Sequence, residues 1–204
     1  MKIGIIVEGK AEYNDLYQII NKTTFGSNQI LAPLFAPMQP KASPMQIARS
    51  AKPVVGILAS KGVQKIVVLI DKENQDFCIC AHARALEAAF TAFCGHIPIE
   101  VVIKNKQFEN WLIADINNLK TMNDFKVSQA FTNKVSLDKA DNQQNPIDLL
   151  EGIMIKRATY AKGTYGKRIV ANINPMRIAG NSRSFRRFLR VLGHPQYLAQ
   201  SKKP

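Results

Sequence analysis

The sequence lacks any apolar run close to the roughly 20 residues that a membrane-spanning helix needs. Its N-terminal apolar stretch is interrupted by Glu8 and has no small-residue cleavage site after it, so we expect a protein that stays in the cytoplasm. Cysteine is also scarce. The three cysteines do not have the spacing of a zinc site, which favours free thiols in a reducing compartment.

Acidic residues are few as well, with 15 Asp and Glu against 28 Lys and Arg, which gives a net charge of +13. Residues 1–116 hold 12 basic and 10 acidic side chains, whereas residues 117–204 hold 16 and 5. A positive field on one part of a protein favours polyanions, so nucleic acid is the expected partner. An anionic membrane surface is the weaker alternative, and basicity that serves only solubility is the third.

The first 116 residues alternate between short β-rich runs and helical runs. This alternation predicts an α/β fold with a mainly parallel sheet flanked by helices. The expected strands are 3–7, 29–35, 65–70 and 99–103, and the expected helices are 12–20, 44–61, 81–94 and a short one in QFENWLIAD.

The C-terminal part has a different character. Residues 117–145 are polar and show no firm periodicity, so we expect a loop or insertion there. Helical patterns return at 146–155, 164–173 and 182–192. We therefore expect an α/β core over residues 1–116 and a basic, mainly helical extension over residues 117–204 that packs on this core.

Acidic side chains follow the ends of three predicted strands. Glu8 follows the first, Asp71 and Glu73 follow the apolar run IVVLI, and Glu109 follows the last after a short loop. A single acid in such a place is more often a helix cap or a solvated loop residue. Parallel strands bring their carboxyl ends to one edge, however, and gathered carboxylates repel each other unless a cation neutralises them. Their joint placement predicts a site for Mg²⁺ or Mn²⁺, which prefer hard oxygen ligands.

Three motifs resemble those of a known family. They are VEGKAE at 7–12, with the later acidic pair in LIDKE at 69–73, Phe-Glu-Asn-Trp at 108–111, and SRSFRRF at 182–188. In this order they resemble the Toprim family, and more closely a group of small standalone Toprim-like proteins of uncharacterised function related to OLD-type nucleases. The resemblance spans nearly the whole chain and implies a Toprim/Rossmann-like fold.

The resemblance also implies roles for the acidic residues. Glu8 would be a metal-linked general acid or base, and Asp71 and Glu73 would be catalytic metal ligands. Glu12 and Glu109 would occupy further metal-linked acidic positions. Glu73 departs from the aspartate that is usual in the family, and its side chain is longer by one methylene group.

Basic residues of the C-terminal part, together with one lysine of the first motif, are the candidates for binding a nucleic acid backbone. They are Lys10, Lys162, Lys167, Arg168, Arg183, Arg186 and Arg187. A solvated face of an amphipathic helix explains the last three equally well. The segment GTYGK is not a P-loop, because no Ser or Thr follows its lysine. Phe108 and Trp111 have a helical spacing that favours the core over a base-stacking surface.

Two functions from different classes follow. The first is a divalent-metal-dependent, Toprim-type nuclease that cleaves phosphodiester bonds, with DNA favoured over RNA. The alternative is a non-catalytic module that binds nucleic acid or partners an ATPase encoded nearby. A small-molecule phosphatase is a weaker possibility, because the first strand ends in Glu8-Gly9 and not in Asp-x-Asp. The chain has no room for the extra modules of a topoisomerase or primase.

Overall fold

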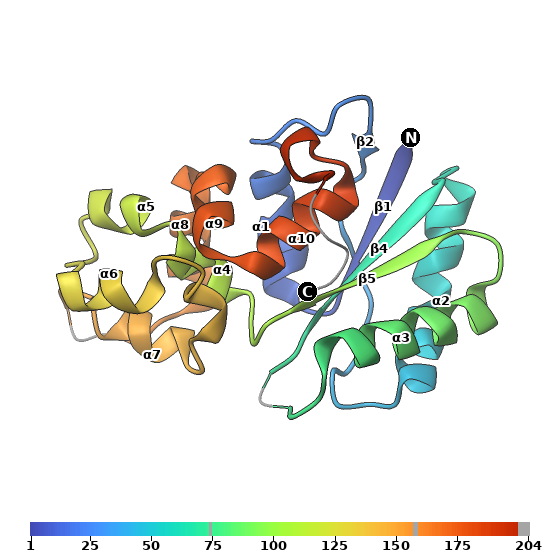
Figure 1. Ribbon diagram of the computed structural model, residues 1–204, viewed down its shortest axis with the longest axis horizontal. Helices are drawn as coiled ribbons and strands as arrows, with labels where there is room; N and C mark the ends of the chain where they lie inside the picture. The colour runs from blue at the N-terminus through green and yellow to red at the C-terminus, as the bar shows by residue number, and fades with distance from the viewer. Residues whose placement is uncertain (74, 157–158, 200–204) are drawn as a thin grey trace.

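The fold is α/β, as the sequence predicts, with one parallel sheet flanked by helices (Figure 1). The computed structural model describes residues 1–73, 75–156 and 159–199, except for the side chain of Ala11. The strands run in the order β2-β1-β4-β5, and β3 also pairs with β1. Their bounds are β1 Lys2–Val7, β2 Gln29–Ile30, β3 Leu34–Phe35, β4 Lys65–Asp71 and β5 Ile99–Lys104.

The central strands are buried on both faces. In β4, Val67 and Leu69 belong to the core on one side of the sheet, and Val68 and Ile70 belong to the core on the other side. Both sets are fully or almost fully buried. This double burial is why the strand reads as a continuous apolar run and not as an alternating one.

Helices cover both faces of the sheet. Helices α2 (Pro44–Ser60) and α3 (Ile79–Cys94) lie together on one face, and α1 (Lys10–Ile20) and α10 (Arg183–Leu192) lie on the other (Figure 1). Helix α2 begins where the sequence predicts, because Ser43 and Gln46 form a capping box and Pro44 takes the first helical position.

The remaining helices form a lobe beside the sheet (Figure 1). The expectation of a loop or insertion over 117–145 is wrong in part, because the short helices α5 (Ile116–Thr121) and α6 (Gln129–Val135) lie there. Helix α9 (Pro175–Asn181) lies between two of the expected helices. Helices of one or two turns show too little periodicity to be recognised, and here capping by Asp115 and Ser128 and burial of Leu119 and Phe131 define them. The lobe comprises α4 Glu109–Ala114, α5 Ile116–Thr121, α6 Gln129–Val135, α7 Pro146–Glu151, α8 Lys167–Asn172 and α9 Pro175–Asn181.

One aromatic cluster joins the two halves of the chain. The Trp111 side chain is fully buried, its indole N–H donates to Oγ of Ser184 at 2.8 Å, and its ring packs against Phe185 and Phe188. The assignment of Trp111 to the core is therefore confirmed. The division at residue 116 stays a prediction, since this core contains side chains from both sides of it.

Candidate active site

The carboxyl ends of β1, β4 and β5 lie side by side. Val7 is paired with Leu69, and Asp71 is paired with Lys104, so the residues at these strand ends share one edge of the sheet. The Glu8 carboxylate reaches across this edge and accepts a hydrogen bond from the backbone N–H of Asp71. The structure thus brings together two of the acids that the sequence analysis selected.

Glu12 reaches the same edge from the first turn of α1. Its side chain folds back over Gly9 and pairs with the ammonium group of Lys104. Glu12 is only 3% exposed, and it lies so close to Gly9 that a side chain there would overlap its carboxylate. This packing explains why VEGKAE holds a glycine between two acids: the glycine leaves room for the second acid to turn inward.

The centre of the acidic group is a lysine that the sequence analysis missed. Lys104 is fully buried at the end of β5, and its Nζ forms ion pairs with Glu12 and, at 2.7 Å, with Oδ1 of Asp71. A signal for it is present, because Lys104 ends β5 at the level where Asp71 ends β4. A lone lysine at the end of a strand is ordinarily solvated, so this signal has little weight without the strand register.

Burial dominates the protonation of two of the acids. Desolvation raises the pKa of Glu8 to about 9, because it outweighs the attraction of Lys104, and the neighbouring Asp71 raises it further. Desolvation also raises the pKa of Asp71 to about 7. The positive charge of Lys104 lowers this pKa, and the negative charge of Glu12 raises it, but desolvation is the largest effect. At neutral pH Glu8 therefore holds a proton, and Asp71 is poised between its two forms.

Ion pairing dominates the other two groups. Burial alone would raise the pKa of Glu12, but the charge and hydrogen bond of Lys104 outweigh it and lower this pKa. Burial would likewise lower the pKa of Lys104, but Asp71, Glu12 and Glu8 together raise it. Lys104 is therefore a permanent positive charge inside the protein.

Glu109 adds a fourth acid at the first turn of α4, where it is 1% exposed. Its carboxylate pairs with Lys162 at 3.0 Å, and its charge is close enough to raise the pKa of Asp71. Lys162 lies half-exposed at the start of the π-helical segment Lys162–Gly166. This ion pair therefore has one buried partner, Glu109, and one partner in contact with solvent.

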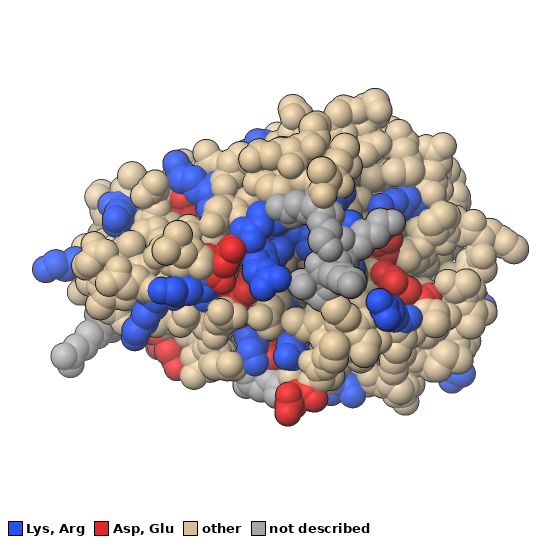
Figure 2. Space-filling view, in the orientation of Figure 1, with Lys and Arg blue, Asp and Glu red and all other residues tan. Residues whose placement is uncertain are grey.

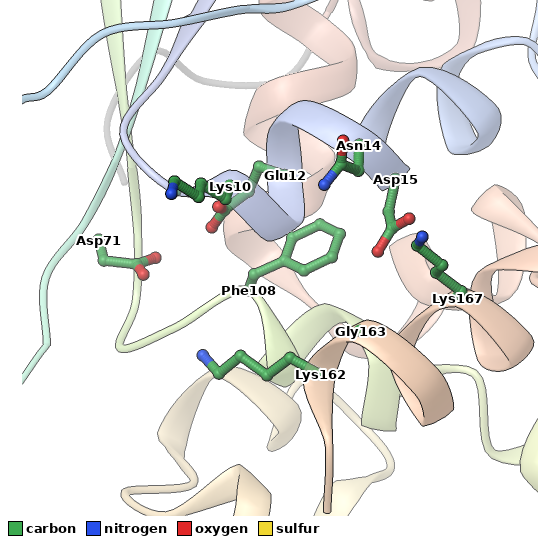
Figure 3. Close-up of a pocket in the computed structure, with 10 residues that line it drawn as sticks. Lys10, Glu12, Asn14, Asp15, Asp71, Phe108, Lys162, Gly163 and Lys167 are labelled. Carbon is green, nitrogen blue, oxygen red and sulfur yellow. The ribbon is translucent and has the colours of Figure 1, made fainter.

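A pocket of about 360 Å³ opens between α1 and this segment (Figure 3). Glu12, Asp71 and Phe108 line it, and Asp15 and Lys167 lie at the far end from Asp71 (Figure 3). Its remaining lining residues are Gly9, Lys10, Asn14, Lys162 and Gly163. Asp15 is a second residue that the sequence analysis missed: it is 3% exposed, and its Oδ1 has no hydrogen-bond partner among the described residues.

Glu73 lies apart from this group. Its backbone has a positive φ of 51°, and its side chain, 37% exposed, lies 3.8 Å from Nζ of Lys41. In the described structure no hydrogen bond or ion pair joins its side chain to Glu12, Asp71 or Lys104, so its role as a metal ligand stays a prediction. Residues two apart in a strand point to the same side, but β4 ends at Asp71, so strand geometry does not turn Glu73 toward Asp71.

The predicted nucleic-acid-binding residues divide into two sets. Lys10, Lys162 and Lys167 line the pocket. The other four lie elsewhere: Arg168 pairs with Asp124, Arg186 pairs with Asp138, Arg187 donates to the carbonyl of Val101, and Arg183 is exposed at the start of α10. Figure 2 shows Lys and Arg gathered over and beside α10, with acidic side chains among them.

The oxygen donors at this edge suit a hard divalent cation, and one of them, Oε2 of Glu8, is buried without a hydrogen-bond partner in the described structure. Over residues 1–73, 75–156 and 159–199, however, no three Asp, Glu, His or Cys side chains converge on one point as metal ligands would. The Lys104 ammonium group lies between Glu12 and Asp71. The donor set therefore fits a metal in chemistry, while its present arrangement is built around lysine.

Comparison with family models gives a match over residues 7–193, to the family described as "Domain of unknown function (DUF4276)". The chain belongs to this DUF4276 family. Neither the curated proteins nor the solved structures include a match to the chain. For the part of the chain that the structure describes, no helix is long and apolar enough to cross a membrane.

The resemblance to the Toprim family is wrong, because the matching model is DUF4276 and no Toprim match accompanies it. The motifs that suggested it are short and have local explanations in this structure. Gly9 makes room for Glu12, and Trp111 and Phe185 belong to the core. Acids after strands and aromatic pairs on helices occur in many α/β folds, so such motifs carry little information about family.

Proposed function

We propose that this DUF4276 protein is a divalent-metal-dependent enzyme that cleaves phosphodiester bonds in nucleic acid. One observation carries the proposal: Glu8 and Asp71, two acids with raised pKa values, meet at one edge of the sheet, where Asp71 lines a pocket together with Lys10, Lys162 and Lys167. Acids that are shifted in this way and face a pocket are typical of catalytic sites. The proposal rests on this arrangement and not on the family, whose function is unknown.

Asp71 and Glu12 are the residues that would hold Mg²⁺ or Mn²⁺. A bound divalent cation would lower the pKa of a coordinated water and stabilise the charge that develops on the phosphate. Glu8 has a separate part. With a pKa of about 9 it carries a proton at neutral pH and can donate it to a departing oxygen, as a general acid does.

The lysines of the pocket would bind the substrate. Lys10 and Lys167 are exposed, and Lys162 is half-exposed, so their ammonium groups can reach phosphate oxygens while the acids lie deeper. The net charge of +13 attracts a polyanion in addition. DNA is the first substrate to test, and RNA is the second.

The alternative is a module that binds nucleic acid, or an ATPase encoded nearby, without catalysis. Lys104 favours this alternative, because its positive charge already pairs with Glu12 and Asp71 and occupies the position between them. Both functions predict binding that weakens with salt, and only the enzyme predicts cleavage.

A plasmid-nicking assay with Mg²⁺ or Mn²⁺ separates the two. We expect the wild type to nick DNA, and we expect Glu8→Gln and Asp71→Asn to reduce the rate by about 100-fold or more, which is typical of losing an acid or base group. Glu100→Gln is the matched control, because Glu100 pairs with Lys65 and lies near the start of β5, away from the pocket. Salt-sensitive binding by the wild type with no metal-dependent cleavage of DNA or RNA would support the non-catalytic module.

A further inference from the structure

Lys104 differs from the other lysines near the pocket in its burial. Its side chain is 0% exposed, whereas that of Lys162 is 50% exposed. The Lys162 ammonium group has a direct route to solvent beside Glu109. The Lys104 ammonium group has no such route, because its ion pairs to Glu12 and Asp71 are what offset its removal from water.

The position of the Lys104 charge is that of a bound cation. It lies between carboxylates from the ends of two elements, Asp71 of β4 and Glu12 of α1, and Glu8 of the β1 end also acts on it electrostatically. The centre of the Phe108 ring lies 5.9 Å from Nζ of Lys104, and this ring gives the site an apolar surface. One positive charge thus occupies the position between the acids that a divalent cation would need.

We propose that Lys104 is an internal counter-ion that competes with the divalent metal for Glu12 and Asp71, and so sets the metal concentration at which the site loads. This inference rests on the proposed metal-dependent function. Metal binding then requires the ammonium group to leave two carboxylates. At low metal concentration Lys104 keeps the acidic edge folded and holds the site inactive.

Removal of the Lys104 charge has two opposite consequences. Without metal, Glu12 and Asp71 repel each other in a buried setting, so the folded state becomes less stable. With metal, the cation no longer has to displace a competitor, so it binds more tightly. A lysine that served the fold alone would give the first effect without the second.

The experiment is a titration of purified protein with Mn²⁺, followed by electron paramagnetic resonance of the free ion, without nucleic acid. The variants are Lys104→Gln, Lys104→Met and Lys104→Arg. Lys65→Gln is the matched control, because Lys65 is a largely buried lysine that pairs with Glu100 at 2.6 Å near the opposite ends of the strands. We expect Lys104→Gln to bind Mn²⁺ about tenfold or more tightly than the wild type, and Lys104→Arg and Lys65→Gln to bind like the wild type.

Thermal melting of the same samples, in EDTA and in Mn²⁺, tests the proposal even if a Lys104 variant is less stable than the wild type. We expect Lys104→Gln to melt below the wild type in EDTA and to gain more from Mn²⁺ than the wild type does. A variant that folds only with Mn²⁺ supports the proposal as well. Failure of both Lys104→Gln and Lys104→Met to fold even in millimolar Mn²⁺ overturns it, because the metal should replace the missing charge.

Binding and nicking, measured in parallel, separate this inference from the proposed function. Equal Mn²⁺ affinity in Lys104→Gln and a wild type that nicks DNA would overturn the role of Lys104 and leave the enzyme. Tighter Mn²⁺ binding in a protein that never nicks would support the role of Lys104 and argue against the enzyme. The absence of Mn²⁺ binding in the wild type and in all three Lys104 variants would overturn both.

Discussion

Gly9 and Glu12 are in such close contact that a side chain at position 9 would overlap Oε2 of Glu12. The backbone of Gly9 does not itself require glycine, since its φ is −105° and its ψ is 143°. The requirement comes from Glu12, whose carboxylate must pass over residue 9 to reach Lys104. The first acidic motif is therefore a packing arrangement as well as a set of charges.

We predict that Gly9→Ala displaces the Glu12 carboxylate and destabilises the protein by about 1–3 kcal/mol, because one partner of a buried hydrogen-bonded pair is lost. Urea unfolding measures this change. Gly56→Ala is the matched control: Gly56 lies inside α2 with open space around its Cα, so alanine there should stabilise the helix by about 0.5–1 kcal/mol. Equal effects at the two positions would mean that Gly9 makes no room for Glu12.

The second prediction concerns pH. The folded-state pKa values of Glu8 and Asp71 are raised to about 9 and about 7, from ordinary values of 4.5 and 3.8. Between about pH 5 and 9 the folded protein therefore holds more protons than the unfolded chain, so its free energy of unfolding falls as the pH rises. The lowered pKa of Glu12 acts below this window, and the raised pKa of Lys104 acts above it.

Thermal melting in EDTA at pH 5, 7 and 9 checks this dependence. We expect the melting temperature of the wild type to fall toward pH 9, by about 2–4 °C for each kcal/mol lost in a protein of this size. Glu8→Gln cannot ionise, so its fall should be clearly smaller, whereas Glu100→Gln should follow the wild type. A profile for Glu8→Gln that parallels the wild type would show that Glu8 does not titrate in this window.

The third prediction tests the pocket lysines as phosphate ligands. We expect the double substitution Lys10→Gln with Lys167→Gln to weaken binding to all DNA sequences alike, and to reduce the slope of log affinity against log salt by about two. Lys162 is left intact, because its loss would leave the buried Glu109 unpaired. Fluorescence anisotropy over a range of salt concentrations measures the slope.

The control for this pair is Lys52→Gln with Lys61→Gln. Both lysines are exposed, one within α2 and the other at its C-terminal end, and the same charge is removed from the opposite face of the sheet. The control should lower the affinity only slightly. An equal loss in both double variants would mean that net charge, and not the pocket, holds the nucleic acid.

The fourth prediction concerns the core that joins the two halves of the chain. Trp111 is the single tryptophan, and it packs on Phe185 and Phe188 from the last helix. We expect its fluorescence and the far-ultraviolet circular dichroism to report one coincident unfolding transition. Trp111→Ala should reduce the free energy of unfolding by about 3–5 kcal/mol, and Trp111→Phe by less. Two separate transitions would instead indicate that residues 1–116 and 117–204 unfold independently.

The architecture of the sheet could be predicted from sequence because its signals are local. Each central strand is a short, mainly apolar run with a charged residue at its end or directly after it. The residues Ser43-Pro44 and Gln46 indicate where α2 begins. The short helices α5 and α6 of the lobe were not predicted, because contacts with distant residues stabilise them. Asn118, for example, donates to the carbonyl of Ile169.

The sequence alone determined that Glu8 and Asp71 follow parallel strands and so meet at one edge, because strand direction decides where strand ends lie. Only the tertiary structure decided what lies between them. Lys104 enters the acidic group because β5 pairs with β4 in the register that sets it opposite Asp71, and Glu12 enters because Gly9 lets it turn inward. The Lys104 charge is buried and shared because α1, β4 and β5 come together in the folded protein. No local pattern in the sequence indicates that these three elements come together.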